Sequence, residues 1–356
     1  TKKPWVSYLD PVETARRQAK ELRPQVDILI AITHLSLAED QQLAAEVPGL
    51  DLVLGGHEHE NWQLRRGEHF TPIFKADANA RSAYIHRLVY DTATRKLRFD
   101  SVLRRITSEM PEDPAAAKVV KEWTERGFQA FRAGGFEPSA LVAQSQEALD
   151  GRESSVRNRS TALTERIGHA MLREWPGADA AIFNSGSIRI DDVIAPGPIT
   201  QYEVIRILPF GGRVLGVEMK GALLARVLEA GLANRGSGGF LQTANIEARP
   251  GGGGWIIGGR ALDPLKTYRV AINDFLMSGG EQGIEFLTRS ADGVAAVVVL
   301  RDIRMAVIDE MKARAKKPAG PLISNLPPRR FGDRGDSLRE DKRVAGIEVI
   351  VHHTDA

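Results

Sequence analysis

The sequence of 356 residues contains no cysteine. Disulfide bonds and thiolate metal ligands are therefore excluded, so any metal site must use imidazole or oxygen ligands. The absence of cysteine leaves the cellular compartment open, because it is compatible with both the cytosol and the periplasm.

Long hydrophobic runs and an excess of one charge are also missing. The longest apolar runs, such as residues 294–300, are far shorter than the ~20 residues that cross a bilayer. Lys and Arg total 48 against 46 for Asp and Glu, a formal net charge of +2. We therefore expect no membrane span and no nucleic acid polymer as a partner. The length and the ordinary globular composition predict two domains, each with its own core.

Helical and strand patterns alternate along the first part of the chain, as in an α/β protein. Asp10 followed by Pro11 predicts the start of a helix that ends near residues 23–24, and a second helix is expected at residues 37–47. Buried strands are expected at residues 27–34 and 51–54. Two-fold alternation at residues 84–90 and 97–99 predicts a hairpin.

A boundary is expected at residues 111–114, followed by a connecting helix at 115–131. Later helices are expected at residues 163–175, 220–232 and 297–317, and strands at 180–183 and 268–272. A charged stretch at residues 329–343 is predicted to be a mobile tail. The resulting division is 1–110, a linker helix at 111–135, a second domain at 136–325 and a tail at 326–356.

Histidines follow two neighbouring expected strands. His34 ends the first strand, and His57 and His59 follow the second strand past Gly55 and Gly56. Two histidines one residue apart are often ordinary surface residues, but the repetition favours a common site. Because ligands gather at the carboxyl ends of strands in layered α/β proteins and histidine is the commonest metal ligand, we expect a divalent metal site here.

The segments Thr33–Leu35 and Gly55–His59 resemble late metal-binding motifs of the calcineurin-like metallophosphoesterases, specifically the 5'-nucleotidase family and its 2',3'-cyclic phosphodiesterase relatives. The resemblance extends to about residue 325. It implies an α/β (α+β) architecture: the C-terminal part of a layered αββα metallophosphoesterase domain, a linker helix and a mixed α/β 5'-nucleotidase C-terminal domain. It also implies divalent metal ions (Mn, Zn, Co or Mg), two in the complete enzyme.

Part of the family's metal site is missing from this sequence. Family members begin with an Asp-x-His pair, a bridging Asp and an Asn-His dipeptide, but neither pair occurs here, and residue 1 is Thr. Without a bridging carboxylate, two adjacent cations are not tolerated at working spacing. We therefore expect the chain to be the later portion of a longer enzyme, with no catalytic residue of its own and little activity alone. An N-terminal fragment is an expected partner.

Three motifs in the second domain resemble nucleotide-recognition motifs of the same family: Asn184–Arg189, Ile207–Gly212 and Asn273–Glu281. By this resemblance, two phenylalanines enclose a purine-like base, two arginines face phosphate and ribose, and an asparagine bonds the base or sugar. The family usually has Asp at the position of Glu281. The expected substrate-binding residues are Arg157, Asn184, Gly186, Arg189, Phe210, Phe275 and Glu281.

Physical chemistry supports this assignment independently. An aromatic face gains ~1 to 3 kcal/mol per stacked base without demanding a particular base, and a guanidinium binds phosphate oxygens two at a time. A lone loop phenylalanine is usually a core residue and a lone arginine is usually solvated. The argument therefore depends on the three motifs occurring together and in order.

Two hypotheses of different classes follow. The first is a metal-dependent phosphomonoesterase or cyclic-nucleotide phosphodiesterase, periplasmic or secreted by resemblance, of which this chain is the larger part. The second is a nucleotide-binding module or degenerate phosphatase without catalysis. A purely structural role leaves the histidine pair and the Asn184–Arg189 motif unexplained.

Overall fold

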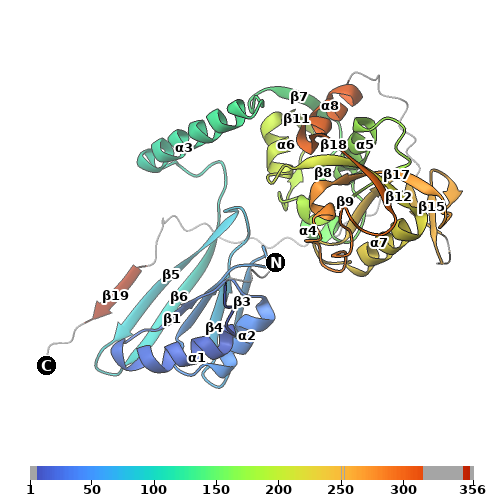
Figure 1. The fold of residues 1–356 in the computed structure, drawn as a ribbon. Coiled ribbons are helices and arrows are strands. Elements are labelled where there is room, and N and C mark those ends of the chain that lie inside the picture. The colour runs from blue at the N-terminus through green and yellow to red at the C-terminus, as the bar shows by residue number, and fades with distance from the viewer. Residues whose placement is uncertain (1–5, 250, 252, 316–347, 353–356) are drawn as a thin grey trace. The chain divides into compact units, whose positions relative to one another are not determined.

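The computed structural model describes residues 6–249, 251, 253–315 and 348–352, and it divides the chain into two compact units (Figure 1). Unit 1 comprises Thr1–Asp113 with Leu326–Ala356, and unit 2 comprises Pro114–Asn325. Among the described residues, no helix is long and apolar enough to span a membrane. The expected mobile tail at residues 329–343 lies outside the described residues.

Two capped helices form the outer layer of unit 1. Helix α1 (Pro11–Leu22) begins at Asp10, whose carboxylate accepts an amide N–H of the first turn at 2.8 Å. Helix α2 (Leu37–Glu46) begins at Ser36, which forms a reciprocal capping box with the first turn. Because these side chains satisfy amide groups that have no partner inside the helix, they fix where each helix starts. Both predicted helices are confirmed.

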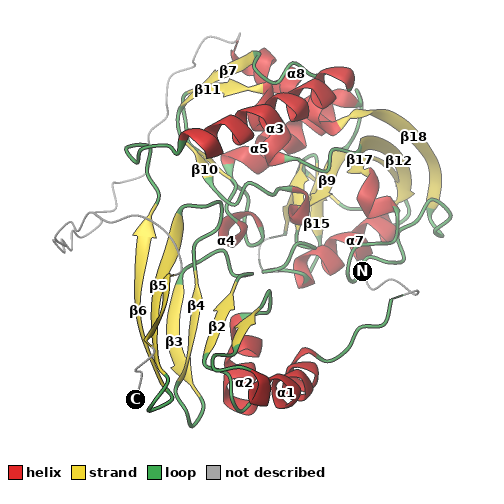
Figure 2. Ribbon diagram, turned by 90° about the vertical axis from the view of Figure 1, so that its left-hand side faces the viewer, coloured by secondary structure: helices red, strands yellow, loops and turns green. Residues whose placement is uncertain are grey.

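Two sheets complete unit 1 (Figure 2). The four-stranded sheet has the order β1 (Ile30–Ile32), β2 (Leu52–Gly55), β4 (Thr71–Lys75), β3 (Trp62–Arg66), with β3 alone antiparallel to its neighbour. The three-stranded sheet has the order β19 (Glu348–His352), β5 (Ser82–Asp91), β6 (Lys96–Arg105), and β5 and β6 form the predicted hairpin. The first strand is shorter than expected and ends before His34.

Each face of the four-stranded sheet covers a separate apolar cluster. Val12, Leu43 and Val53 belong to the cluster shared with α1 and α2. Phe74 and Leu88 belong to the cluster shared with the β5–β6 hairpin. The unit is therefore layered as helices, sheet and sheet, with both ends of the central strands left for loops.

Unit 2 is built around one five-stranded sheet. Its order is β13 (Leu241–Ala244), β9 (Ala180–Asn184), β17 (Thr267–Asn273), β12 (Arg213–Lys220), β18 (Val294–Asp302). Strands β9 and β17 are parallel, and the other neighbours are antiparallel. Because side chains alternate along a strand, Ala180 and Ile182 face one core while Ala181 and Phe183 face the other.

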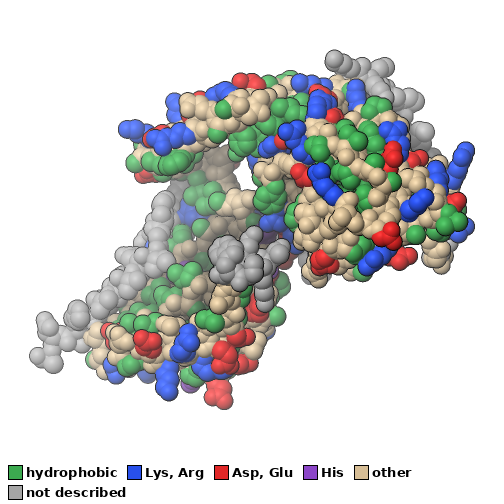
Figure 3. All heavy atoms as spheres, in the orientation of Figure 1, with side chains coloured by type: hydrophobic (Ala, Val, Ile, Leu, Met, Phe, Trp, Pro, Cys, Tyr) green, Lys and Arg blue, Asp and Glu red, His purple; other side chains and the backbone are tan. Residues whose placement is uncertain are grey.

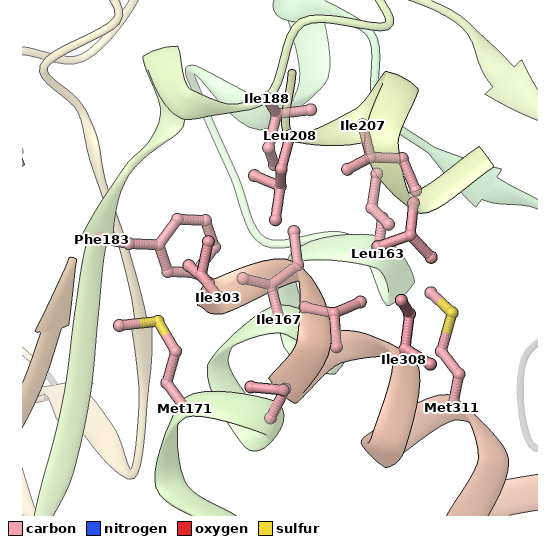
Figure 4. Close-up of a cluster of buried hydrophobic side chains, with 14 of the residues drawn as sticks. Leu163, Ile167, Met171, Phe183, Ile188, Ile207, Leu208, Ile303, Ile308 and Met311 are labelled. Atoms are coloured by element: carbon pink, nitrogen blue, oxygen red, sulfur yellow. The ribbon is translucent and has the colours of Figure 1, made fainter. Parts of the chain in front are cut away.

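Helices cover both faces of this sheet. On one face lie α5 (Ala162–Glu174), α6 (Gln201–Ile207) and α8 (Ile303–Ala315), whose buried side chains make up most of the core in Figure 4. On the other face lies α7 (Gly221–Ala233). The shorter elements are β7 (Leu141–Ser145), β8 (Leu149–Asp150), α4 (Glu153–Val156), β10 (Val193–Ile194), β11 (Gly197–Thr200), β14 (Ile246–Ala248), β15 (Trp255–Ile257) and β16 (Arg260–Ala261).

The prediction of a single helix at residues 297–317 is wrong in its first part. Residues 297–302 continue strand β18, and helix α8 begins only at Ile303. The run of β-branched side chains before Leu300 favours a strand, and its pairing with β12 supplies the partner that the sequence pattern alone does not reveal. The helices predicted at 163–175 and 220–232 are confirmed to within one residue.

Helix α3 (Pro114–Ala133) belongs to unit 2 and has no buried residue. Val119, Val120 and Trp123 are exposed on it. Elsewhere on the face of unit 2 seen in Figure 3, acidic and basic side chains are interspersed, with no single-sign patch.

Candidate functional site

His34 and His57 lie side by side at the carboxyl ends of β1 and β2. These strands are parallel neighbours with Ile32 opposite Leu54, and the pairing continues as the amide of Thr33 donates to the carbonyl of Leu54 at 2.9 Å. The two imidazole centroids are 5.4 Å apart and nearly perpendicular. Both rings are exposed, so they are accessible to a ligand from solvent.

The two glycines before His57 are required by close packing. A Cβ on Gly56 would lie 3.2 Å from Nδ1 of His34. A Cβ on Gly55 would lie 2.7 Å from Oδ2 of Asp40 and 2.8 Å from Cε of Lys75. The Gly-Gly bend therefore brings the backbone against both the histidine and a buried ion pair, and a larger residue at Gly55 would force the ion pair to shift.

Lys75 is the buried cation beneath the histidine loops, with a side chain only 1% exposed. Its Nζ lies 2.8 Å from Oδ2 of fully buried Asp40 and forms a second ion pair with Glu58. It also donates to the carbonyls of Leu35 at 2.7 Å and Gly56 at 2.9 Å. Because a buried charge is costly unless it is paired and hydrogen-bonded, these contacts tie the two loops together at one point.

Glu58 extends this connection to helix α2. Its carboxylate accepts the backbone N–H of Leu37 while it pairs with Lys75. The flanking residues His57 and His59 both have positive φ, 86° and 62°, a conformation uncommon for side chains other than glycine. The loop is thus held in an unfavourable backbone conformation by contacts on both sides of Glu58.

His59 is half-buried, and its carbonyl accepts the amide of Ala78 at 3.2 Å. Within the described residues, no group of three or more His, Asp or Glu has the geometry to hold a metal ion. The structure therefore brings His34 and His57 together and leaves His59 outside such a group. Two adjacent imidazoles match the chemistry of a divalent metal site but supply fewer than the three protein ligands of a catalytic zinc centre.

A cavity of about 620 Å³ lies in unit 2 at the ends of β9 and β17. Phe210 and Phe275 both line it and are 76% and 43% exposed. Its lining consists of Asn184, Gly186, Ser187, Phe210, Gly211, Gly212, Asn273, Asp274, Phe275 and Ser278. Exposed aromatic faces over a polar floor suit a flat, hydrogen-bonding ligand.

Asn184 is the hub of a buried amide network on that floor. Its Nδ2 donates to Oε2 of Glu281 at 2.8 Å, and its Oδ1 accepts from Ser187 Oγ at 2.6 Å and from Asn273 Nδ2 at 2.9 Å. Because a carboxylate only accepts hydrogen bonds, Glu281 fixes which way each amide points. Oδ1 of Asn273 is left buried without a hydrogen-bond partner among the described residues.

Glu281 itself is buried and does not line the cavity. Burial raises the pKa of its carboxyl group, and the hydrogen bonds from the amides of Gln282 and Asn184 oppose that rise. Its connection to the cavity runs through Asn184 rather than directly. Substrate binding by Glu281 therefore stays a prediction.

The two expected arginines meet at one carboxylate next to the cavity. Arg157 forms an ion pair with Oε1 of Glu153, and Arg189 lies 3.5 Å from the same oxygen. The guanidinium of Arg189 is 6.0 Å from the ring centroid of Phe210. Neither arginine lines the cavity, so they flank it on the Phe210 side.

Sequence reasoning missed Lys75, Glu153 and Asn273. Asn273 opens the Asn273–Glu281 motif, from which Phe275 was predicted to bind the base. Its position two residues before Phe275 was the signal that could have identified it. Lys75 and Glu153 carry no motif. A charged residue closing an otherwise apolar strand, Thr71–Lys75, was the only sign of a buried cation.

Comparison with known proteins identifies the class. Residues 141–289 match the family model described as 5'-nucleotidase, C-terminal domain. The chain is 30% identical over 373 aligned residues to the trifunctional nucleotide phosphoesterase protein YfkN of Bacillus subtilis, covering 95% of the chain and 24% of that relative. It is 26% identical to protein UshA of Yersinia enterocolitica, covering 78% of the chain and 58% of that relative.

A solved structure agrees with these relatives. The 5'-nucleotidase precursor from Thermus thermophilus superposes with a TM-score of 0.71 at 25% identity, covering 90% of this chain and 68% of that one. The chain thus spans between about a quarter and three fifths of the length of the two curated relatives. Residues 141–289 therefore match a 5'-nucleotidase C-terminal domain, and the first relative and the solved structure that the chain resembles are by name a nucleotide phosphoesterase and a 5'-nucleotidase.

Proposed function

We propose that the protein containing this chain hydrolyses nucleotide phosphoesters with divalent metal ions, as a phosphomonoesterase or cyclic-nucleotide phosphodiesterase. The observation that carries the proposal is the cavity in which Phe210 and Phe275 share a polar floor with Asn184. Relatives named as 5'-nucleotidases and nucleotide phosphoesterases support the reaction class. Residues 136–325 would bind the nucleotide, and residues 1–110 would contribute to a metallophosphoesterase domain.

In this proposal, His34, His57 and His59 are metal ligands, and Lys75 with Glu58 holds the loops that carry them. Bound divalent ions would polarise the phosphoryl group and activate a water molecule. The chain's own contribution is to present neutral imidazoles at the ends of adjacent strands. Which of Mn, Zn, Co or Mg is used is part of the same proposal.

We further propose that these 356 residues alone do not turn over substrate. They contain no Asp-x-His pair and no Asn-His dipeptide, and the imidazoles supply no negative charge to offset two cations. Hydrolysis would then need a polypeptide that supplies those motifs, in the same chain or as a bound N-terminal fragment. The family resemblance also motivates a periplasmic or secreted location, which cell fractionation tests.

Nucleotide binding tests the proposal in the chain itself. Calorimetric titration with adenosine 5'-monophosphate should give binding without added metal, and the double variant Phe210→Ala with Phe275→Ala should weaken it by about 100-fold or more, from two lost stacking faces. Phe70→Ala is the control, because Phe70 is an exposed phenylalanine in unit 1, away from the cavity. Unchanged binding in the double variant would contradict the proposed cavity.

Hydrolysis tests the metal half of the proposal. A longer polypeptide that includes the missing motifs should release phosphate from the same nucleotide, and His57→Ala should reduce its rate by about 100-fold or more. His69→Ala is the control, because His69 is an exposed histidine away from β1 and β2. Binding that survives in a protein with no measurable turnover would favour the nucleotide-binding module instead.

A further inference from the structure

The carboxylate of Glu153 is shared by both arginines that flank the cavity. Its Oε1 pairs with a terminal nitrogen of Arg157 and lies 3.5 Å from a terminal nitrogen of Arg189. The three side chains are 19%, 24% and 40% exposed, respectively. The arrangement is therefore partly shielded from water, which strengthens the ionic contacts relative to those of a fully exposed pair.

The backbone holds all three residues in place. Glu153 opens α4, and its amide donates to Oδ1 of Asp191 at 2.8 Å, which anchors it to the loop that carries Arg189. Arg157 caps the same short helix, and its carbonyl accepts the amide of Gly236 at 2.9 Å. The two arginines come from segments far apart in the sequence and converge because Glu153 is fixed between them.

The cluster remains positively charged and keeps unused hydrogen-bond donors. Two guanidinium groups this close repel each other, and one negative charge between them leaves the cluster with a net charge of +1 from Arg157, Arg189 and Glu153. Each guanidinium has five N–H donors, and the contact with Oε1 engages one terminal nitrogen of each. Donors therefore remain for a second, anionic acceptor.

We propose that Glu153 is a positioning residue that sets the spacing of Arg157 and Arg189 for the phosphate of a nucleotide whose base lies between Phe210 and Phe275. This inference rests on the proposed nucleotide binding. The link between the two subsites is Arg189, which lies 6.0 Å from the centroid of the Phe210 ring. Positioning, and not the net charge of the cluster, is the property that Glu153 contributes.

Calorimetric titration of the 356-residue chain with adenosine 5'-monophosphate and with adenosine measures this contribution. The dissociation constant for adenosine divided by that for adenosine 5'-monophosphate gives the gain in affinity from the phosphate. Glu153→Ala should reduce that ratio by about 10-fold and leave the affinity for adenosine within about 2-fold, because only the arginines lose their anchor. Glu153→Gln keeps an acceptor oxygen without the charge and should retain the ratio within about 3-fold.

Glu122→Ala is the matched control, because Glu122 and Arg126 form an ion pair with the same i,i+4 spacing on α3. It should leave both dissociation constants unchanged, and melting curves establish that every variant is folded. A retained ratio in Glu153→Ala, or equal behaviour of the Ala and Gln variants, would overturn the positioning role. Wild-type protein that binds neither ligand would overturn the proposed nucleotide site, and equal wild-type affinity for both ligands would overturn the phosphate role of the arginines.

Discussion

The two units hold their polar sites in place with different kinds of interaction. In unit 1, the histidine loops are fastened by buried charges, Lys75 with Asp40 and Glu58. In unit 2, the amide side chains of the cavity floor hold one another in place, and the carboxylate of Glu281 accepts a hydrogen bond at the end of that network. Removal of one partner of a buried ion pair is strongly destabilising. The stability of unit 1 should therefore be more sensitive than that of unit 2 to substitution beneath its site.

The largest effect is expected when the buried cation of unit 1 is removed. Lys75→Met should lower the free energy of unfolding of unit 1 by about 3–5 kcal/mol, because it leaves the buried Asp40 and the partly buried Glu58 without their cation. Hydrogen exchange of peptides from each unit measures this separately, and unit 2 should be unchanged. Lys266→Met is the control, because it removes an exposed ion pair in which Nζ of Lys266 lies 3.8 Å from Oδ1 of Asp179. Adding Asp40→Asn to Lys75→Met should recover part of the loss.

A second substitution tests the close packing above Lys75. Gly55→Ala should destabilise unit 1 by about 1–3 kcal/mol, because the added methyl group meets Asp40 and Lys75 at 2.7 and 2.8 Å. Gly127→Ala is the control with the opposite sign: it lies in α3 with nothing within 4 Å of the new Cβ, so it should stabilise by up to about 1 kcal/mol. Denaturant unfolding compares the two, and equal effects would argue against the packing explanation.

Asp150 provides a smaller test in unit 2. The hydrogen bond from Arg152 lowers the pKa of the Asp150 carboxyl group to about 2, against the opposing effect of burial. The stabilisation that follows from this lowered pKa is complete above about pH 3.8 and is lost as the pH falls toward 2. Since Arg152 is half exposed, Asp150→Asn should cost only about 1 kcal/mol at neutral pH. Urea unfolding at several pH values should show this decline in the free energy of unfolding in the wild type and not in Asp150→Asn.

The smallest effect concerns His86 of unit 1. Burial lowers the pKa of its imidazole, which lies 2.8 Å from the hydroxyl of Ser101. A lowered histidine pKa means that the stabilisation is complete above pH 6.5 and declines as the pH falls below that value. Between about pH 7.5 and 5.5, the amide protection factors of unit 1, which correct for the slower intrinsic exchange at lower pH, should fall. His86→Phe should abolish that change, whereas His69→Phe, at an exposed position, should not.

Local signals predicted much of this fold. Helix α1 begins where Asp10 and Pro11 indicate, and the β5–β6 hairpin follows its two-fold alternation. The failure at residues 297–302 has a physical reason. An apolar β-branched run is compatible with a strand or a helix until its partner is known, and that partner, β12, lies about 80 residues earlier.

The candidate site was predictable only where a motif named its residues. Phe210, Phe275 and Asn184 line one cavity, as expected from their order in the sequence, although their roles stay predictions. Lys75 could not be identified from the sequence, because its importance arises from partners on two distant segments, Leu35 and Asp40 on one and Gly56 and Glu58 on the other. Such convergence is a property of the folded chain and leaves no pattern in the neighbouring residues.

The pairing of β19 with β5 has a consequence for biosynthesis. Glu348–His352 lies parallel to Arg87–Asp91, so unit 1 is assembled from both ends of the chain and unit 2 is inserted within it. A ribosome therefore releases all of unit 2 before the last strand of unit 1 emerges. Until then the edge of β5 has unpaired backbone groups, which can pair with another chain and promote aggregation.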